Sequence, residues 1–254
     1  MRYGEVREGT SALIFVTEPF SKSKQVKLDN WRDTSSDNVS VLKLNMTKKF
    51  TTGIYPYSMM MSTFKPVSID QYQKVFKVSS STQEWCGHTW LQLNASGKGY
   101  DLSGFSYFES EGDVEEELKD VLLEDEIWST IRLNPANLPV GDLSLLPSTF
   151  YLRLKHVPFT EQKAKAELRS LEQSEFSSAA HQQYNLTYDN RSLSIYFEQE
   201  FPYQILGWEE KYRDRRGSSE MQITQAKRIK SIKSAYWGEN SNADQPLRTE
   251  LGLE

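Results

Sequence analysis

Apolar and polar residues alternate along most of the chain, which is the pattern of β-strands with one buried face. Residues 12–17 form a strong apolar strand, and the alternation is clearest in residues 39–46, 184–188 and 193–197. Asp189-Asn190 separates the last two segments and predicts a tight hairpin turn. Lys48-Lys49 is the turn expected after residues 39–46, with a returning strand over residues 50–64. These segments predict antiparallel pairing as the main organisation of the fold.

Further strands are expected along the rest of the chain. The expected strands are residues 72–80, 84–94, 100–111, 150–156, 162–171, 204–213 and 220–236. For residues 162–171 a helix is the alternative, because their Ala, Glu, Lys and Leu content favours helix. Ser96-Gly97-Lys98-Gly99 is a turn between two of them. Pro56 lies inside the strand over residues 50–64, and it indicates a bulge or a sheet edge because proline has no backbone N–H to donate.

Helical periodicity is confined to short segments. An i, i+4, i+7, i+8 stripe is formed by Val114, Leu118, Val121 and Leu122. Asp113 precedes this stripe as a candidate N-cap, and Ile127, Trp128 and Ile131 suit a second short helix. We expect one or two helices between about residues 113 and 132, with the stripe packed on the concave side of the sheet. Residues 244–251 predict a short terminal helix that ends at Gly252.

The fold class that follows is mainly β, with a large curved antiparallel sheet or half-barrel and one or two short helices. A single β-rich domain is expected over residues 1–252, and the loop at residues 134–147, with three prolines and a glycine, is the candidate internal boundary. Met1-Arg2-Tyr3-Gly4 passes almost directly into strand-like sequence. We therefore expect the natural chain to begin further upstream, with a leader.

Composition narrows the class of protein. Of the 254 residues, 37% are hydrophobic and 12% aromatic, which indicates a folded chain. A net charge of −5 argues against general nucleic-acid binding, which needs a positive field. The sequence has no run of 18 apolar residues, so no transmembrane helix is predicted. Its single cysteine excludes an internal disulfide. The common nucleotide-binding and hydrolase motifs, such as Gly-x-x-x-x-Gly-Lys-Ser/Thr and Gly-x-Ser-x-Gly, do not occur.

The segment at residues 79–94 holds the single cysteine. Read as one strand, it places Glu84, Cys86, His88 and Trp90 on the same face. Glu84, Cys86 and His88 can be two metal ligands with a carboxylate, or a Cys–His nucleophile pair, with His156 or His181 as a further ligand. The interpretation that we favour is a buried, unreactive Cys86 with a raised pKa, no metal, no cofactor and no catalytic residue.

Charged residues gather in two parts of the chain. The acidic run over residues 109–126 is interpreted as a solvated helix face. The basic residues are Lys211, Arg213, Arg215, Arg216, Lys227, Arg228, Lys230 and Lys233. They are expected to coat an outer sheet face, with contact to anionic headgroups as the alternative.

Five motifs carry a resemblance to a known family. They are Tyr3-Gly-Glu-x-Arg-x-Gly9, Leu13-Ile-Phe-Val-Thr-Glu18, Gly53-Ile-Tyr-Pro-Tyr-Ser-Met59, Gln83-Glu-Trp-Cys-Gly-His88 and Tyr107-Phe-Glu-x-Glu-Gly-Asp113. Over nearly its whole length the chain resembles an uncharacterised family of exported bacterial envelope proteins. Some members carry the label of septum-formation inhibitor Maf, but the Ser-x-Ser-Pro-Arg-Arg loop of true Maf pyrophosphatases is missing here. The resemblance implies a periplasmic or outer-membrane-associated protein.

The expected architecture is similar to outer-membrane lipoprotein carriers, in which a curved sheet wraps a helix or an apolar ligand. We therefore expect a non-enzymatic envelope protein that holds a lipid-like ligand or a protein partner in a concave sheet. The candidate wall residues are Tyr55, Tyr57, Met59, Met61, Trp90, Phe105 and Tyr107. The alternatives are a metal- or thiol-dependent enzyme that uses Glu84, Cys86 and His88, and a structural assembly component that pairs through an exposed sheet edge.

Overall fold

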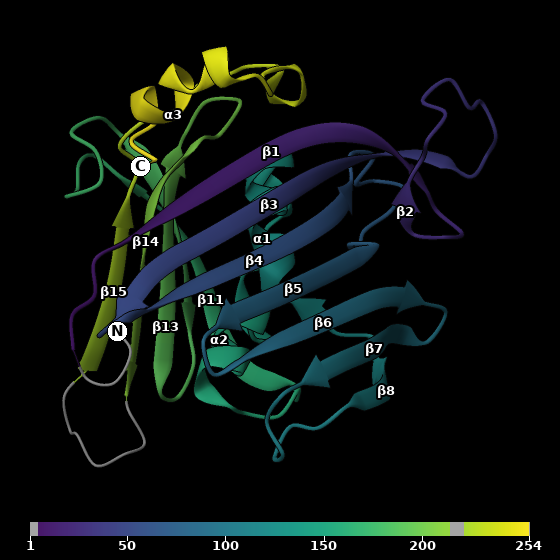
Figure 1. The fold of residues 1–254 in the computed structure, drawn as a ribbon, viewed down its shortest axis with the longest axis horizontal. Coiled ribbons are helices and arrows are strands. Elements are labelled where there is room, and N and C mark those ends of the chain that lie inside the picture. The colour runs from purple at the N-terminus through teal and green to yellow at the C-terminus, as the bar shows by residue number, and fades with distance from the viewer. Residues whose placement is uncertain (1–4, 214–220, 254) are drawn as a thin grey trace.

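The computed structural model describes residues 5–213 and 221–253, and it contains two β-sheets (Figure 1). The first sheet is antiparallel, with the strand order β2-β1-β3-β4-β5-β6-β7-β8. Its strands are β1 (Gly9–Ser21), β2 (Val26–Lys27), β3 (Asn38–Thr52), β4 (Tyr55–Pro66), β5 (Lys77–Glu84), β6 (Gly87–Ser96), β7 (Gly99–Ser106) and β8 (Val114–Lys119). Neighbouring strands in this sheet are consecutive along the chain, except for β1 and β3, because β2 pairs with the other edge of β1.

The second sheet follows directly along the chain, with the order β15-β14-β13-β12-β11-β10-β9. Its strands are β9 (Leu122–Leu123), β10 (Gly141–Leu146), β11 (Gln162–Leu171), β12 (His181–Thr187), β13 (Arg191–Glu198), β14 (Ile205–Arg213) and β15 (Met221–Lys227). All pairs are antiparallel except β9 with β10. The predicted mainly β fold is confirmed, with the strands divided between two sheets.

The helical elements are all short. They are α1 (Ile127–Leu133), α2 (Thr149–Lys155), α3 (Pro246–Glu250) and the 3₁₀ turns η1 (Glu124–Glu126), η2 (Pro135–Asn137), η3 (Tyr236–Gly238) and η4 (Asn242–Asp244). Isolated helices of this length are unstable in water, so tertiary packing must hold them. The prediction of a terminal helix is confirmed by α3, and Gly252 just after it has a φ of 67°.

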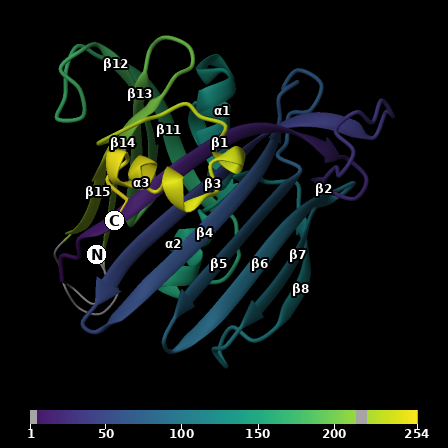
Figure 2. The same cartoon turned by 45° about the horizontal axis from the view of Figure 1, so that its top comes forward.

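One hydrophobic core fills the space between the sheets. Inward residues of β4 and β6, such as Met59, Met61 and Leu93, meet Ile195 and Phe197 of β13 in the same buried cluster. α1 packs on β3 and β4, and α2 packs on β4. Both helices therefore contact the first sheet at β4, and Figure 2 shows α1 behind β1 and α2 behind β4. The concave side of the first sheet is filled by the protein's own helices and second sheet.

Several predicted elements are corrected by the structure. Residues 114–119 form β8, and residues 150–156 fall largely in α2. Val114 and Leu118, four residues apart, share a face in a strand as well as in a helix, so their spacing did not distinguish the two. Both still pack against the core, as expected of the stripe.

Strand bounds and turns also differ from the prediction in places. The turn between β3 and β4 lies at Gly53, whose φ is 58°, and not at the predicted Lys48-Lys49, because β3 continues through Lys48 to Thr52. The loop at residues 134–147 contains β10. β11 has the predicted bounds, and the turn at Asp189-Asn190 joins β12 to β13 as expected. The last strand ends at Lys227, and its predicted first residue lies outside the described residues.

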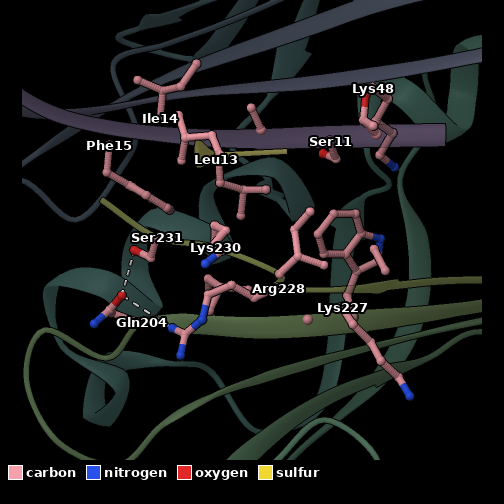
Figure 3. A pocket seen from close by; sticks show the side chains of 18 of the residues that line it. Ser11, Leu13, Ile14, Phe15, Lys48, Gln204, Lys227, Arg228, Lys230 and Ser231 are labelled. Carbon is pink, nitrogen blue, oxygen red and sulfur yellow. Dashed lines mark hydrogen bonds between the residues drawn. The ribbon is translucent and has the colours of Figure 1, made fainter. Parts of the chain in front are cut away.

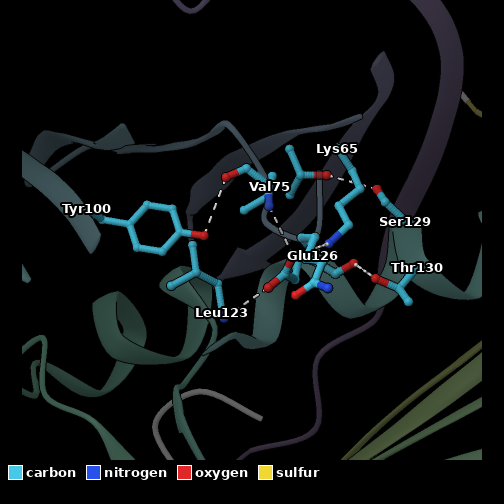
Figure 4. Close-up of polar contacts among 9 residues, drawn as sticks. Lys65, Val75, Tyr100, Leu123, Glu126, Ser129 and Thr130 are labelled. Atoms are coloured by element: carbon cyan, nitrogen blue, oxygen red, sulfur yellow. Dashed lines mark hydrogen bonds and ion pairs between the residues drawn. The ribbon is translucent and has the colours of Figure 1, made fainter. Parts of the chain in front are cut away.

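A buried acidic turn joins the two sheets. Glu124, Asp125 and Glu126 of η1 are 1%, 2% and 3% exposed, so this end of the acidic run is not the solvated face that was expected. Glu126 Oε2 lies 2.6 Å from Lys65 Nζ of β4 and accepts a hydrogen bond from the Val75 N–H (Figure 4). Since both charges are buried, the ion pair compensates a desolvation that either charge alone would suffer.

Candidate functional site

A groove with a volume of about 2060 Å³ runs between β1 and the strands β14 and β15 (Figure 3). Ligand pockets in proteins usually measure about 300–1,000 Å³, so this groove exceeds the size needed for a drug-sized molecule. The chain that follows β15, over residues 228–234, and the residues just after α3 complete its lining. The groove is therefore built from both sheets and the C-terminal segment.

The groove exists because β1 has one open edge. β1 pairs with β3 along its whole length, but with β2 only at Phe20 and Ser21. Between Gly9 and Glu18 the other edge has no strand partner in the described part of the chain. β15 is the last strand of the second sheet. Backbone N–H and C=O groups at such edges are available for hydrogen bonding.

The floor of the groove is apolar. Leu13 and Phe15 of β1 pack against the core, and Ile205 and Trp208 of β14 are 7% and 6% exposed. Ile229, which is 70% exposed, stands on the opposite rim. Exposed apolar side chains beside a concavity are a common mark of a binding surface.

Basic side chains dominate the polar part of the lining. Ten lining residues are Lys or Arg, and Glu210 is the one acidic residue among them. The basic ones are Arg7, Lys48, Lys49, Arg132, Lys155, Lys227, Arg228, Lys230, Lys233 and Arg248. The whole chain carries a net charge of −5, so this is a local reversal of sign. A groove lined by one sign of charge attracts ligands of the opposite sign.

Only some of these cations are neutralised by an acid. Arg7 pairs with Glu5, and Lys227 and Arg228 pair with Glu175 and Glu198. In the described part of the chain, no carboxylate lies within 4.0 Å of six of the lining cations, namely Lys48, Lys49, Arg132, Lys230, Lys233 and Arg248. Four residues of the predicted basic set line the groove, namely Lys227, Arg228, Lys230 and Lys233. Arg215 and Arg216 of the same set lie outside the described residues.

Lys48 marks the inner end of the groove. Its Nζ lies 5.1 Å from the centre of the Phe150 ring and 5.8 Å from that of Trp208. Burial lowers the pKa of this ammonium, and the charge of Glu210 opposes that shift. A cavity of about 30 Å³ beside Lys48, also lined by Trp208 and Glu210, has room for a water molecule.

Glu210 is held by a buried ion cluster. Arg191 Nε lies 2.6 Å from Glu210 Oε1, and the same guanidinium contacts both oxygens of Glu124 at 2.6 Å. The Tyr188 hydroxyl donates to Glu124 Oε2 at 2.5 Å. Burial raises the pKa of Tyr188, so this phenol stays protonated. Sequence reasoning missed this cluster because its members are dispersed among unremarkable strand and turn residues.

The opposite end of the groove holds a different set of charges. Arg132 Nε donates to the Pro202 carbonyl at 2.7 Å, and its guanidinium lies 4.4 Å from the centre of the Phe15 ring. Arg228 pairs with Glu198 at 2.9 Å. Burial is the main cause that lowers the pKa of Arg132, while Glu198 raises it and Arg228 lowers it further. Two arginines at this end therefore act on one shared carboxylate.

The predicted wall residues lie away from the groove. Tyr57, Met59 and Met61 are buried in the core, because α1 and α2 cover that side of the first sheet. The other predicted wall residues are partly buried or exposed, and they are Tyr55, Trp90, Phe105 and Tyr107. Trp90 and Phe105 stack with ring centres 5.8 Å apart. They lie on the outer face, since the neighbouring Thr89 and Leu91 face inward.

The hairpin between β5 and β6 separates the residues of the candidate thiol site from one another. Glu84 pairs with Gly87, so Trp85 and Cys86 form the turn and the alternation assumed for one strand is broken. Glu84 is buried, and its Oε2 accepts from the Cys86 backbone N–H at 2.6 Å. Cys86 is exposed, so the prediction of a buried thiol is wrong. A hydrogen bond to Glu84 is the main cause that raises the pKa of Cys86.

The histidines do not complete a metal site with this hairpin. His88 is exposed, His156 contacts Glu111 at 2.5 Å, and His181 contacts Ser174 at 2.8 Å. Among residues 5–213 and 221–253, no group of three or more His, Cys, Asp or Glu side chains is arranged to hold a metal ion.

None of the helices in residues 5–213 and 221–253 is both long enough and apolar enough to cross a membrane. Comparison of the chain with profiles of protein families, with curated proteins and with solved structures finds no match.

Proposed function

We propose that the chain binds a lipid-like ligand in the groove between β1 and β14–β15, without catalysing a reaction on it. The observation that carries the proposal is the combination of a large volume, an apolar floor and a basic lining. We further propose that this binding takes place in the envelope of a double-membraned bacterium, as the resemblance of the sequence implies.

Removal of apolar surface from water supplies the driving force. Burial of such surface contributes about 25 cal/mol per Å², and an acyl chain laid on Leu13, Phe15 and Trp208 would cover apolar area on both partners. The open edge of β1 and the basic side chains keep polar groups within the same groove. These groups favour an amphiphilic ligand over a pure hydrocarbon, because buried polar groups need partners.

A partner segment is the second candidate occupant. The open edge of β1 between Gly9 and Glu18 can accept an added strand through main-chain hydrogen bonds, as in other β-augmentation complexes. The two candidates differ in the mass and the chemistry of what is bound.

The test is native mass spectrometry of the protein purified from its own cell envelope, followed by solvent extraction. We expect an added lipid-sized mass that the solvent removes, whereas an added polypeptide would support the partner segment. Repeated preparations without either, together with no saturable binding of a fluorescent acyl probe, would contradict both.

A point variant localises the binding. Leu13→Ser removes apolar floor and should weaken binding of the acyl probe, while Ile54→Ser, at a residue that is 81% exposed outside the groove, should not. Thermal unfolding of both variants separates weaker binding from loss of the fold. Equal probe affinity in the two variants would place the ligand elsewhere.

A further inference from the structure

One end of the groove carries positive charge that nearby acids do not balance. Arg132, at the last turn of α1, has no carboxylate within 4.0 Å in the described part of the chain, and its Nε donates to a backbone carbonyl. Lys230 lies in the same lining and is exposed. Arg228 is paired with Glu198 and also donates to the Gln204 side chain at 3.3 Å.

Desolvation makes the charge of Arg132 costly. Its guanidinium covers the Phe15 ring at 4.4 Å and is partly withdrawn from water. Glu198, which is paired with Arg228, offsets part of this cost, and the smaller repulsion from Arg228 adds to it. An anionic group placed here would accept charge-assisted hydrogen bonds, which are stronger than neutral ones.

The inner end of the groove is electrically different. Lys48 is accompanied there by Glu210, and Arg191 is held between Glu210 and Glu124. Within this cluster Lys48 and Arg191 are matched by Glu210 and Glu124, so the cluster offers an added anion little net attraction.

The two ends are joined by an apolar path. Phe15 of β1 contacts Arg132, whereas Ser11 of β1 is the β3 partner of Lys48. Four residues of extended strand separate Ser11 from Phe15, a span of roughly 13 Å. Leu13 lies between them on β1, and Trp208 lines the same groove from β14.

We infer that the ligand of this groove is an amphiphile with an anionic head, bound at Arg132, Arg228 and Lys230, and with its apolar chain directed along β1 toward Trp208. This inference rests on the proposed function and adds the chemical class and the orientation of the ligand. Gln204 and Ser231, which are hydrogen-bonded at 3.0 Å beside Arg228, supply neutral polar groups at the head (Figure 3).

The experiment compares three competitors of a bound fluorescent acyl probe. Laurate has the chain and the anion, dodecanol has the chain alone, and acetate has the anion alone. We expect laurate to compete on the order of tenfold more strongly than dodecanol, since a hydrogen bond to a charged group is worth more than one to a neutral group. Acetate should not compete at the same concentration.

Two variants locate the head. Arg132→Gln should weaken laurate binding on the order of tenfold and leave dodecanol unchanged. Lys119→Gln is the matched control, because it removes the same charge from an exposed position of β8 outside the groove and should alter neither. Lys230→Gln, at an exposed position, repeats the test without risk to α1. Laurate binding to the unaltered protein should also weaken as salt is added.

Each contradictory result has a distinct meaning. Equal competition by laurate and dodecanol, or equal losses for both in Arg132→Gln and Lys230→Gln, would overturn the anionic head and leave the lipid-like ligand standing. Competition by acetate would indicate a simple anion site and overturn the amphiphile. No competition by laurate or dodecanol would overturn this inference together with the proposed function.

Discussion

Arg191 of β13 and Glu124 of η1 form a bidentate ion pair, in which Nη1–Oε2 and Nη2–Oε1 both measure 2.6 Å. The two side chains are 2% and 1% exposed. The remaining Nε of Arg191 reaches Glu210, the one acidic residue of the groove lining. The pair therefore connects the joint between the sheets to the inner end of the groove.

Removal of this arginine should destabilise the protein strongly. Arg191→Met leaves Glu124 buried without its counter-charge, and breaking a buried pair in this way costs about 3–5 kcal/mol. Urea unfolding measures the change. Arg169→Met, at an exposed arginine paired with Glu167 on β11, is the control and should change stability by less than about 1 kcal/mol. Similar losses in the two variants would contradict the structural role of the cluster.

Asp125 should make stability depend on pH. Burial raises the pKa of Asp125 from 3.8 to about 6, so the folded state binds its proton more tightly than the unfolded state. The free energy of unfolding contributed by this group therefore falls as pH rises from about 4 to about 6, by about 3 kcal/mol at most.

Asp125→Asn removes that titration while it retains a carbonyl oxygen to accept from the Thr149 N–H, a bond of 2.9 Å in the native protein. Denaturant unfolding at several pH values should show the variant gaining stability relative to the native protein across this interval. A constant difference between the two proteins would contradict the raised pKa.

Cys86 should react slowly in the folded protein, even though it is exposed. The thiolate is the reactive form, and the hydrogen bond and the charge of Glu84 raise the pKa of the thiol. We expect the labelling rate by a thiol reagent to rise with pH, with a midpoint above the ordinary value of about 8.5. Glu84→Gln should lower that midpoint, whereas Asp101→Asn, at an exposed residue of β7, should leave it unchanged. Rapid labelling of the native protein at neutral pH would refute the effect of Glu84.

Gly99 should not tolerate a side chain. Its φ is 144°, and a Cβ at this position would lie 2.2 Å from the Leu118 carbonyl oxygen of β8. Gly99→Ala should therefore destabilise the β7–β8 pair, at a cost of about 1–3 kcal/mol. Gly97→Ala, in the same turn but with open space around it, should cost less than about 1 kcal/mol. Thermal unfolding of the two variants makes the comparison, and equal melting temperatures would contradict the clash.

Local pattern was enough to predict most of the strands. The alternation of Ala164, Ala166 and Leu168 predicted β11 against a helix-favouring composition, and Asp189-Asn190 marks the turn between β12 and β13. Pattern failed where one spacing suits two structures, as for Val114 and Leu118, which share a face in either element. It also failed at residues 150–156, where a strand was expected and α2 formed.

The sequence by itself determined that this protein is mainly β, because alternation is a property of the local backbone and needs no distant partner. Only the tertiary structure decided that Glu124, Asp125 and Glu126 are buried, since the cost of burying a charge depends on partners such as Arg191 and Lys65 from other strands. The tertiary structure also determined where the groove lies and which residues line it. Lys48, Arg132 and Arg228 are far apart along the chain, and their charges meet in one lining because β1 leaves an open edge beside β14 and β15.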